Sequence, residues 1–84
     1  MPDTNLPEIA SKVRRIAATM LGVKPHELET KSLREAGADS VDCVSLIMQV
    51  ENEFSVSIAD LEIEGAGTVD EIAALVARKL GVAV

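Results

Sequence analysis

Few residues of this chain could do covalent chemistry. It contains one cysteine, Cys43, and one histidine, His26, and a Cys–His pair is an arrangement used in nucleophilic catalysis. However, Cys43 falls on the apolar face of a predicted helix, and His26 falls in a loop next to Pro25. A thiol in apolar surroundings is inert. The sequence therefore predicts an inert thiol at Cys43 and no Cys–His catalytic pair.

Residues 60–71 have the ligand spacing of a calcium-binding EF-hand loop. Acidic residues stand at loop positions 1, 3, 5 and 12, and Gly65 stands at position 6. The match is imperfect, because glutamates replace shorter acids, Gly67 replaces an apolar residue, and residues 55–58 are a poor entering helix. We expect no dedicated metal site, although an EF-hand-like calcium-binding module and weak binding of divalent ions stay open as alternatives.

A serine stands at the start of the second of the predicted helices, which spans residues 39–54. Asp39 can cap this helix, and Asp42 stands where the acid of a capping box belongs. Ser40 therefore falls in the first turn.

Two further long helices are predicted from apolar stripes and capping residues. The first spans residues 6–21, beginning at Asn5 and ending at Gly22. The last spans residues 69–80, and a capping box that starts at Thr68 opens it.

The segments between these helices are less regular. Residues 22–38 have no sustained period and predict a long ordered loop, pinned to the core by Leu28 and Leu33. A short helix is expected near residues 60–63. The predicted fold is all-α, a small four-helix bundle with three long helices and a short third one, formed as a single domain over residues 1–84.

The predicted second helix is apolar on two sides. One stripe is a sufficient core face and comprises Cys43, Leu46, Ile47, Val50 and Phe54. The other stripe, Val41, Val44 and Met48, is bordered by acids. Periodicity leaves two interpretations open, a central helix buried on both sides or a helix that docks a partner.

Composition excludes several classes of protein. The 84 residues are 48% hydrophobic and carry a net charge of −6, which argues against nucleic acid as a partner. The longest apolar run is six residues, too short for a membrane span, and the N-terminus lacks the features of a signal peptide. One cysteine excludes an intramolecular disulfide and suits a reducing compartment. We expect a cytoplasmic monomer.

The negative charge is concentrated in the second half of the chain. Residues 1–38 contain six basic and five acidic side chains, whereas residues 39–84 contain two basic and nine acidic ones. Between Asp39 and Glu71 there is no lysine or arginine. This distribution favours a basic partner attracted to that surface.

The segment Gly37 to Asp42 resembles the prosthetic-group site of acyl carrier proteins. In that family an Asp-Ser-Leu sequence or a close variant follows a glycine at the start of the second helix of a four-helix bundle. The likeness continues from the first helix through Leu80 and includes Leu21-Gly22-Val23, Leu33, Glu53-Phe54, Ile58 and Thr68-Val69.

The resemblance implies that the chain is a carrier and not an enzyme, with no catalytic residue, and that Ser40 is its attachment site. A phosphopantetheinyl transferase would join its hydroxyl to 4′-phosphopantetheine from coenzyme A, and the arm would carry acyl groups as thioesters. A hydroxyl at a helix start is exposed, and the positive end of the helix dipole suits the phosphodiester. Asp39 would cap the helix and contact the transferase.

The resemblance also implies partner and cargo contacts. Acyl-transferring and chain-modifying enzymes with basic docking surfaces would meet the second helix at Asp39, Asp42, Val44, Met48 and Glu51. The core face would open to shelter an acyl chain, although plain core packing explains the same residues. These acyl-pocket candidates are Leu46, Ile47, Val50, Phe54, Ile58, Leu61, Ile63 and Ile72.

Several positions depart from the family pattern. Val41 replaces the common leucine, Ser45 and Asn52 replace acids, and small residues stand at Ser32 and Ala36. A specialised carrier for an unusual acyl chain or a dedicated lipid pathway is therefore as plausible as housekeeping fatty acid synthesis. A peptidyl or D-alanyl carrier and a non-carrier acidic adaptor are the remaining alternatives.

Overall fold

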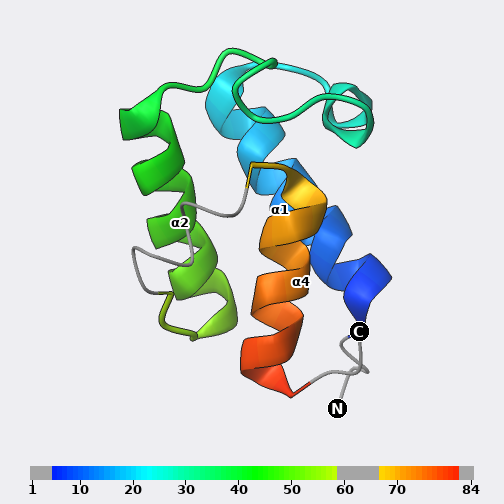
Figure 1. Ribbon diagram of the computed structural model, residues 1–84, viewed down its shortest axis with the longest axis vertical. Helices are drawn as coiled ribbons and strands as arrows, with labels where there is room; N and C mark the ends of the chain where they lie inside the picture. Colours follow the sequence, from blue (N-terminus) through cyan, green and yellow to red (C-terminus); the bar gives the residue numbers. More distant parts are fainter. Residues whose placement is uncertain (1–4, 59–66, 82–84) are drawn as a thin grey trace.

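A computed structural model describes residues 5–58 and 67–81, and within these ranges the fold is helical without strands. The α-helices are α1 (Leu6–Leu21), α2 (Ser40–Phe54) and α4 (Val69–Leu80), and a short 3-10 helix, η1, spans Pro25–Glu29 (Figure 1). The prediction of an all-α fold is confirmed. The short helix expected near residues 60–63 lies outside the described residues, so the described part contains three α-helices and one 3-10 helix.

The three predicted long helices begin and end where their capping residues indicated. Asn5 caps α1 by accepting a 3.0 Å hydrogen bond from the Glu8 N–H, and Gly22 closes it. Thr68 caps α4 by accepting a 3.2 Å hydrogen bond from the Glu71 N–H. Among the described helices, none is long and apolar enough to cross a membrane.

The helix α1 is the centre of the bundle. It packs most extensively against α4 and also contacts α2 and η1, and Figure 1 shows it running opposite to α2 and α4. Its predicted stripe supplies Ile9 and Val13, both fully buried, while α4 supplies Ile72 and Val76. Among the described residues, no polar or charged residue is buried in this core. The core is therefore aliphatic, as the composition predicted.

The loop between α1 and α2 is ordered by two buried leucines. Leu28, in η1, is 4% exposed and Leu33 is 3% exposed, which confirms that both pin the loop to the core. Neither η1 nor the capping-box pair that follows it was predicted from the sequence. In this pair the Ser32 N–H donates to Glu35 Oε1 at 2.8 Å, and the Glu35 N–H donates to Ser32 Oγ at 3.1 Å.

Candidate functional site

The first residue of α2 is Ser40, an exposed serine held by a reciprocal capping box. Asp39 Oδ1 accepts a 2.8 Å hydrogen bond from the Asp42 N–H, and Asp42 Oδ2 accepts a 3.2 Å bond from the Asp39 N–H. Both aspartates therefore fix the backbone on either side of Ser40. The predicted cap is confirmed.

The backbone that leads into Ser40 is tied to Leu33, and through Leu33 to Gly67. The Leu33 carbonyl accepts a 2.9 Å hydrogen bond from the Ala38 N–H, and the Leu33 N–H donates a 3.0 Å bond to the Gly67 carbonyl. Leu33 itself is buried in the core. The start of α2 is thus held by side-chain packing and by a backbone link to the residue before the α4 cap.

The Ser40 hydroxyl is free to take a substituent. Within residues 5–58 and 67–81 no hydrogen-bond partner of its Oγ is found, and the residue is exposed. It lies at the positive end of a 15-residue helix, which favours an anionic group such as a phosphodiester. The exposure of Ser40, the absence of a hydrogen-bond partner for its Oγ among the described residues, and the helix dipole together suit a covalently attached phosphate ester.

One side of α2 presents an apolar strip to solvent. Val41 is 71% exposed, Val44 is 55% exposed and Met48 is 59% exposed. The opposite face carries Leu46, Ile47 and Val50, which are all buried. Of the two interpretations that periodicity left open, a helix buried on both sides is therefore wrong, since the second stripe of α2 is exposed.

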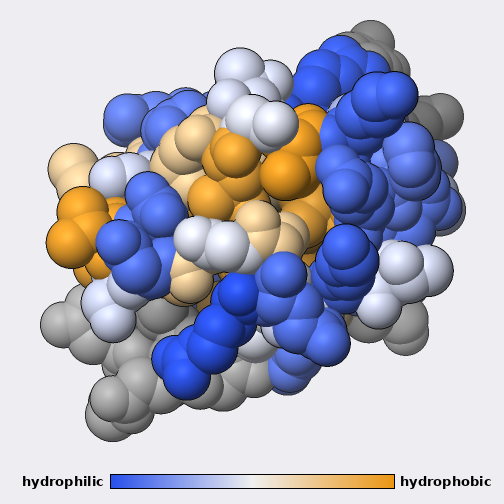
Figure 2. Space-filling view, turned by 90° about the horizontal axis from the view of Figure 1, so that it is seen from above, coloured by the Kyte–Doolittle hydropathy of each residue, from blue (hydrophilic) through white to orange (hydrophobic). Residues whose placement is uncertain are grey.

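Figure 2 looks down on the end of the molecule where α1 ends and α2 begins. Apolar surface is gathered there and is bordered by hydrophilic residues on several sides. This end contains the start of α2, and hence Ser40, together with the loop over residues 22–38 (Figure 1). The candidate attachment serine therefore lies at an end of the bundle that combines apolar and polar surface.

Glu51 is engaged within the chain. Its Oε2 accepts a 2.8 Å hydrogen bond from the Ile58 N–H in a partly buried contact, and the side chain is half-buried. The family resemblance implied that Glu51 docks a partner, and this contact gives its carboxylate a second role that no local pattern indicated.

The residues predicted to form an acyl pocket are core residues where they are described. Leu46, Ile47, Val50, Ile58 and Ile72 are buried, and Phe54 packs against them half-buried. The Lys12 Nζ lies 6.0 Å from the centre of the Phe54 ring. Leu61 and Ile63 lie outside the described residues. Core packing and an acyl pocket that opens on loading both agree with this arrangement.

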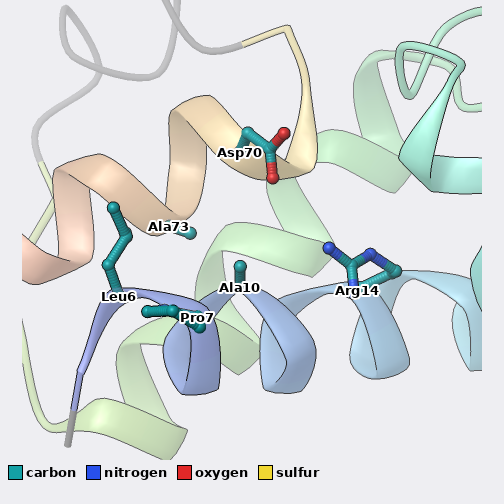
Figure 3. Close-up of a pocket in the computed structure, with 6 residues that line it drawn as sticks. All are labelled: Leu6, Pro7, Ala10, Arg14, Asp70 and Ala73. Atoms are coloured by element: carbon teal, nitrogen blue, oxygen red, sulfur yellow. The ribbon is translucent and has the colours of Figure 1, made fainter.

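A separate groove of about 400 Å³ lies between α1 and α4. Figure 3 shows Leu6 and Pro7 near one end and Arg14 at the other, with Ala10 between them and Asp70 and Ala73 on α4. The Arg14 Nε is buried and has no hydrogen-bond partner among the described residues. None of the predicted acyl-pocket residues lines this groove.

The other groups with chemical potential are not assembled into a site. Cys43 is a free, half-buried thiol packed against the core, and His26 is exposed in η1. Residues 5–58 and 67–81 contain no cluster of three or more metal-ligating side chains. Most of the EF-hand-like segment lies outside these ranges.

Comparisons with known proteins agree with this site. Residues 11–83 match the model of the family described as "Phosphopantetheine attachment site". The acyl carrier protein of Thermotoga maritima is 41% identical over 76 residues, which cover 88% of this chain and 94% of the relative. The acyl carrier proteins of Chlorobium phaeovibrioides and Chlorobium luteolum are each 40% identical over 74 residues, which cover 86% of this chain and 95% of each relative.

The fold, the free serine at a helix start and these matches define a phosphopantetheine-binding carrier domain. The chain belongs to the acyl carrier protein family. Its cofactor is 4′-phosphopantetheine, attached covalently, and proteins of this family carry acyl groups and are not enzymes.

Proposed function

We propose that Ser40 carries the 4′-phosphopantetheine arm and that the protein presents acyl thioesters to enzymes of fatty acid or specialised lipid synthesis. The observation that carries this proposal is the exposed Ser40 hydroxyl at the first position of α2, which has no competing partner among the described residues. The arm supplies a terminal thiol on which acyl groups are held.

Two parts of the chain would hold and orient the base of the arm. The α2 N-terminus favours the phosphodiester electrostatically. The Asp39–Asp42 capping box fixes the backbone on either side of Ser40, with hydrogen bonds of 2.8 and 3.2 Å. Neither aspartate can donate a proton to the phosphate when ionised, so their part is to position Ser40 and to attract basic partners.

The exposed side of α2 is the proposed docking surface for the phosphopantetheinyl transferase and for acyl-handling enzymes. Val44 and Met48 supply apolar contact area, and Asp39 and Asp42 attract lysine and arginine side chains. Exposed ion pairs contribute little each, so the acids serve mainly to orient and accelerate encounter. Glu51 belongs to the same proposed set, but its carboxylate oxygen that accepts the Ile58 N–H must give up that bond to pair with a partner's cation.

The remaining parts of the proposal concern the whole chain. The chain forms a single domain and works as a monomer in the cytoplasm, where Cys43 stays reduced. The aliphatic core face of α2 receives the acyl chain. Phe54 is the one aromatic residue of the sequence, and this supports the proposal. Small aliphatic side chains can shift to admit an acyl chain without moving a large rigid ring.

Modification of the apo protein tests the role of Ser40. The protein is incubated with coenzyme A and a promiscuous phosphopantetheinyl transferase, and the intact mass is measured. We expect the gain of one phosphopantetheine, its loss in Ser40→Ala, and its retention in Ser45→Ala, a matched serine on the same helix. No mass gain under conditions that modify a control carrier would overturn the proposal.

Charging the holo protein tests the class of cargo. Fatty acyl, aminoacyl and D-alanyl donors are offered with their transferring enzymes, and thioester formation is followed by mass. Preferential loading of fatty acyl groups supports lipid synthesis. Loading by aminoacyl or D-alanyl donors alone would overturn that assignment and favour an aminoacyl carrier.

A further inference from the structure

The last turn of α2 is continued by a segment that Glu51 holds through its backbone and its side chain. The Glu51 carbonyl accepts hydrogen bonds from the Ser55 N–H, which caps the helix, and from the Val56 N–H at 3.2 Å. The Glu51 carboxylate accepts the 2.8 Å bond from the Ile58 N–H. One residue therefore accepts three of the four backbone N–H groups of residues 55–58.

This segment adopts a conformation that needs support. Ser55 has φ 55° and ψ 46°, the left-handed region, and it is the only non-glycine residue among those described with a positive φ. Such a conformation is unfavourable for a residue with a Cβ atom. The hydrogen bonds to Glu51 stabilise the turn that begins at Ser55.

The consequence of the turn is the position of Ile58. Its side chain is 7% exposed and belongs to the same core cluster as Leu46, Ile47 and Val50 on α2. The Glu51 contact acts on the Ile58 backbone, so it fixes where this side chain enters the core. Among the described residues, the hydrogen bond to Glu51 is the directional contact of Ile58, because apolar packing of its side chain is not directional.

We propose that Glu51 is a positioning residue that fixes Ile58 against the core face of α2, and thereby sets how readily an acyl chain enters there. The second half of this statement rests on the proposed carrier function. The role differs from docking, because a carboxylate that accepts the Ile58 N–H in a partly buried contact must give up that bond to pair with a partner's cation. Glu53, two residues on, is exposed and makes no such contact.

Two substitutions separate the positioning role from a docking role. Glu51→Ala removes the acceptor and the charge, whereas Glu51→Gln removes the charge and keeps a side-chain oxygen that can accept the Ile58 N–H. Glu53→Ala is the matched control, since it removes an exposed glutamate of the same helix. All three variants are expected to fold, because none changes a residue of the buried core.

The first measurement uses the apo protein and needs no cofactor. Amide hydrogen exchange at Ile58 is followed by NMR. We expect exchange about tenfold faster in Glu51→Ala, as for loss of a hydrogen bond to a charged group, near-wild-type exchange in Glu51→Gln, and no change in Glu53→Ala. Unchanged exchange in Glu51→Ala would overturn the proposal.

The second measurement addresses docking and acyl access. Docking is measured separately, as the rate of modification by a phosphopantetheinyl transferase. A fall of the same size in Glu51→Ala and Glu51→Gln would mean that the charge of Glu51 acts on the partner, and would overturn the assignment to positioning. The acyl-loaded holo protein is then exposed to hydroxylamine, and we expect thioester cleavage in Glu51→Ala to differ at least several-fold from wild type, with Glu51→Gln close to wild type.

Failure of the Glu51 proposal and failure of the proposed carrier function give different results. Equal cleavage in all variants would overturn the link to acyl access. Failure of Ser40 to be modified at all would count against the proposed carrier function and would leave the exchange result at Ile58 standing.

Discussion

The backbone N–H of Leu33 donates a 3.0 Å hydrogen bond to the carbonyl of Gly67 and so joins the loop before α2 to the residue before the α4 cap. The Leu33 carbonyl accepts in turn from the Ala36 and Ala38 N–H groups, at 3.1 and 2.9 Å. A buried leucine therefore sets the path of the chain into Asp39 and Ser40. The serine is exposed and can reach solvent, while the backbone behind it is held on both sides.

The turn between Leu33 and Asp39 depends on the backbone freedom of Gly37. Its φ of 105° is rarely adopted by residues with a Cβ atom, although an added Cβ would meet no atom within 4 Å. We expect Gly37→Ala to lower the free energy of unfolding by about 1–3 kcal/mol through backbone strain alone. Urea unfolding measures the change.

Gly67→Ala is the matched control for Gly37→Ala. Gly67 does not have a positive φ, and its added Cβ would lie in ordinary contact, 3.7 Å from Glu71 Oε1. We expect a change in the free energy of unfolding within about 1 kcal/mol, of either sign. Equal losses in both variants would show that the conformation of Gly37 is not the cause.

Local signals predicted the helices well because each helix start contains its own cap. Asn5, Asp39 and Thr68 accept hydrogen bonds from residues three positions on, so sequence spacing alone encodes the contact. The Ser32–Glu35 pair has the same spacing and could have been found by the same rule. The Leu33–Gly67 bond could not, because it joins two backbones and leaves no side-chain signature.

The candidate site was likewise predicted in part, because local patterns indicated some of its features and not others. Ser40 and its capping aspartates follow from local spacing and from the family resemblance. Periodicity identified the Val44 and Met48 stripe but could not decide whether it is buried, since that depends on which helices pack where. The bond from Ile58 to Glu51 escaped prediction because it depends on the left-handed turn at Ser55.

The Ser32–Glu35 pair makes the stability of the protein depend on pH in the acid range. The Ser32 N–H, and next its hydroxyl, lower the pKa of the Glu35 carboxyl below its ordinary value of 4.5, since they favour the charged form. A depressed folded-state pKa contributes stability that is fully present above pH 4.5 and is lost as the pH falls through the lower, folded-state value. Stability therefore falls on acidification through this window.

Substitution of Ser32 tests this assignment. We expect Ser32→Ala to raise the pKa of Glu35 part of the way to its ordinary value, because the backbone N–H of residue 32 still donates. An NMR titration of the Glu35 side-chain carboxyl carbon measures it, with Ser57→Ala as a control at an exposed serine elsewhere. A wild-type Glu35 that titrates at or above pH 4.5 would contradict the prediction.

Asp39 has a structural role and a proposed docking role that two variants can separate. Asp39→Ala removes the cap and is expected to cost about 0.5–2 kcal/mol of unfolding free energy. Asp39→Asn keeps a capping oxygen, so its cost is expected to stay within about 0.5 kcal/mol. If the Asp39 charge contacts the transferase, the rate of modification of Ser40 falls in both variants. A normal rate in Asp39→Asn would restrict Asp39 to capping.

The exposed strip of α2 should serve binding and contribute little to folding. Met48 and Val44 are 59% and 55% exposed, so the double variant Val44→Ala/Met48→Ala removes little buried surface, and we expect the free energy of unfolding to change by about 0.5 kcal/mol or less. Leu46→Ala, at a leucine of the same helix that is 1% exposed, should instead cost about 2–5 kcal/mol.

Affinity for a partner enzyme should fall in the same double variant, although its stability hardly changes. Loss of two apolar contacts in the proposed docking surface is expected to weaken binding to a phosphopantetheinyl transferase about tenfold or more, as measured by calorimetry with the apo protein. Thr19→Ala, an exposed position on α1, is the control and should leave the affinity unchanged. Because the double variant stays folded, any loss of affinity must arise at the α2 surface, and undiminished binding would show that the partner approaches Ser40 from another side.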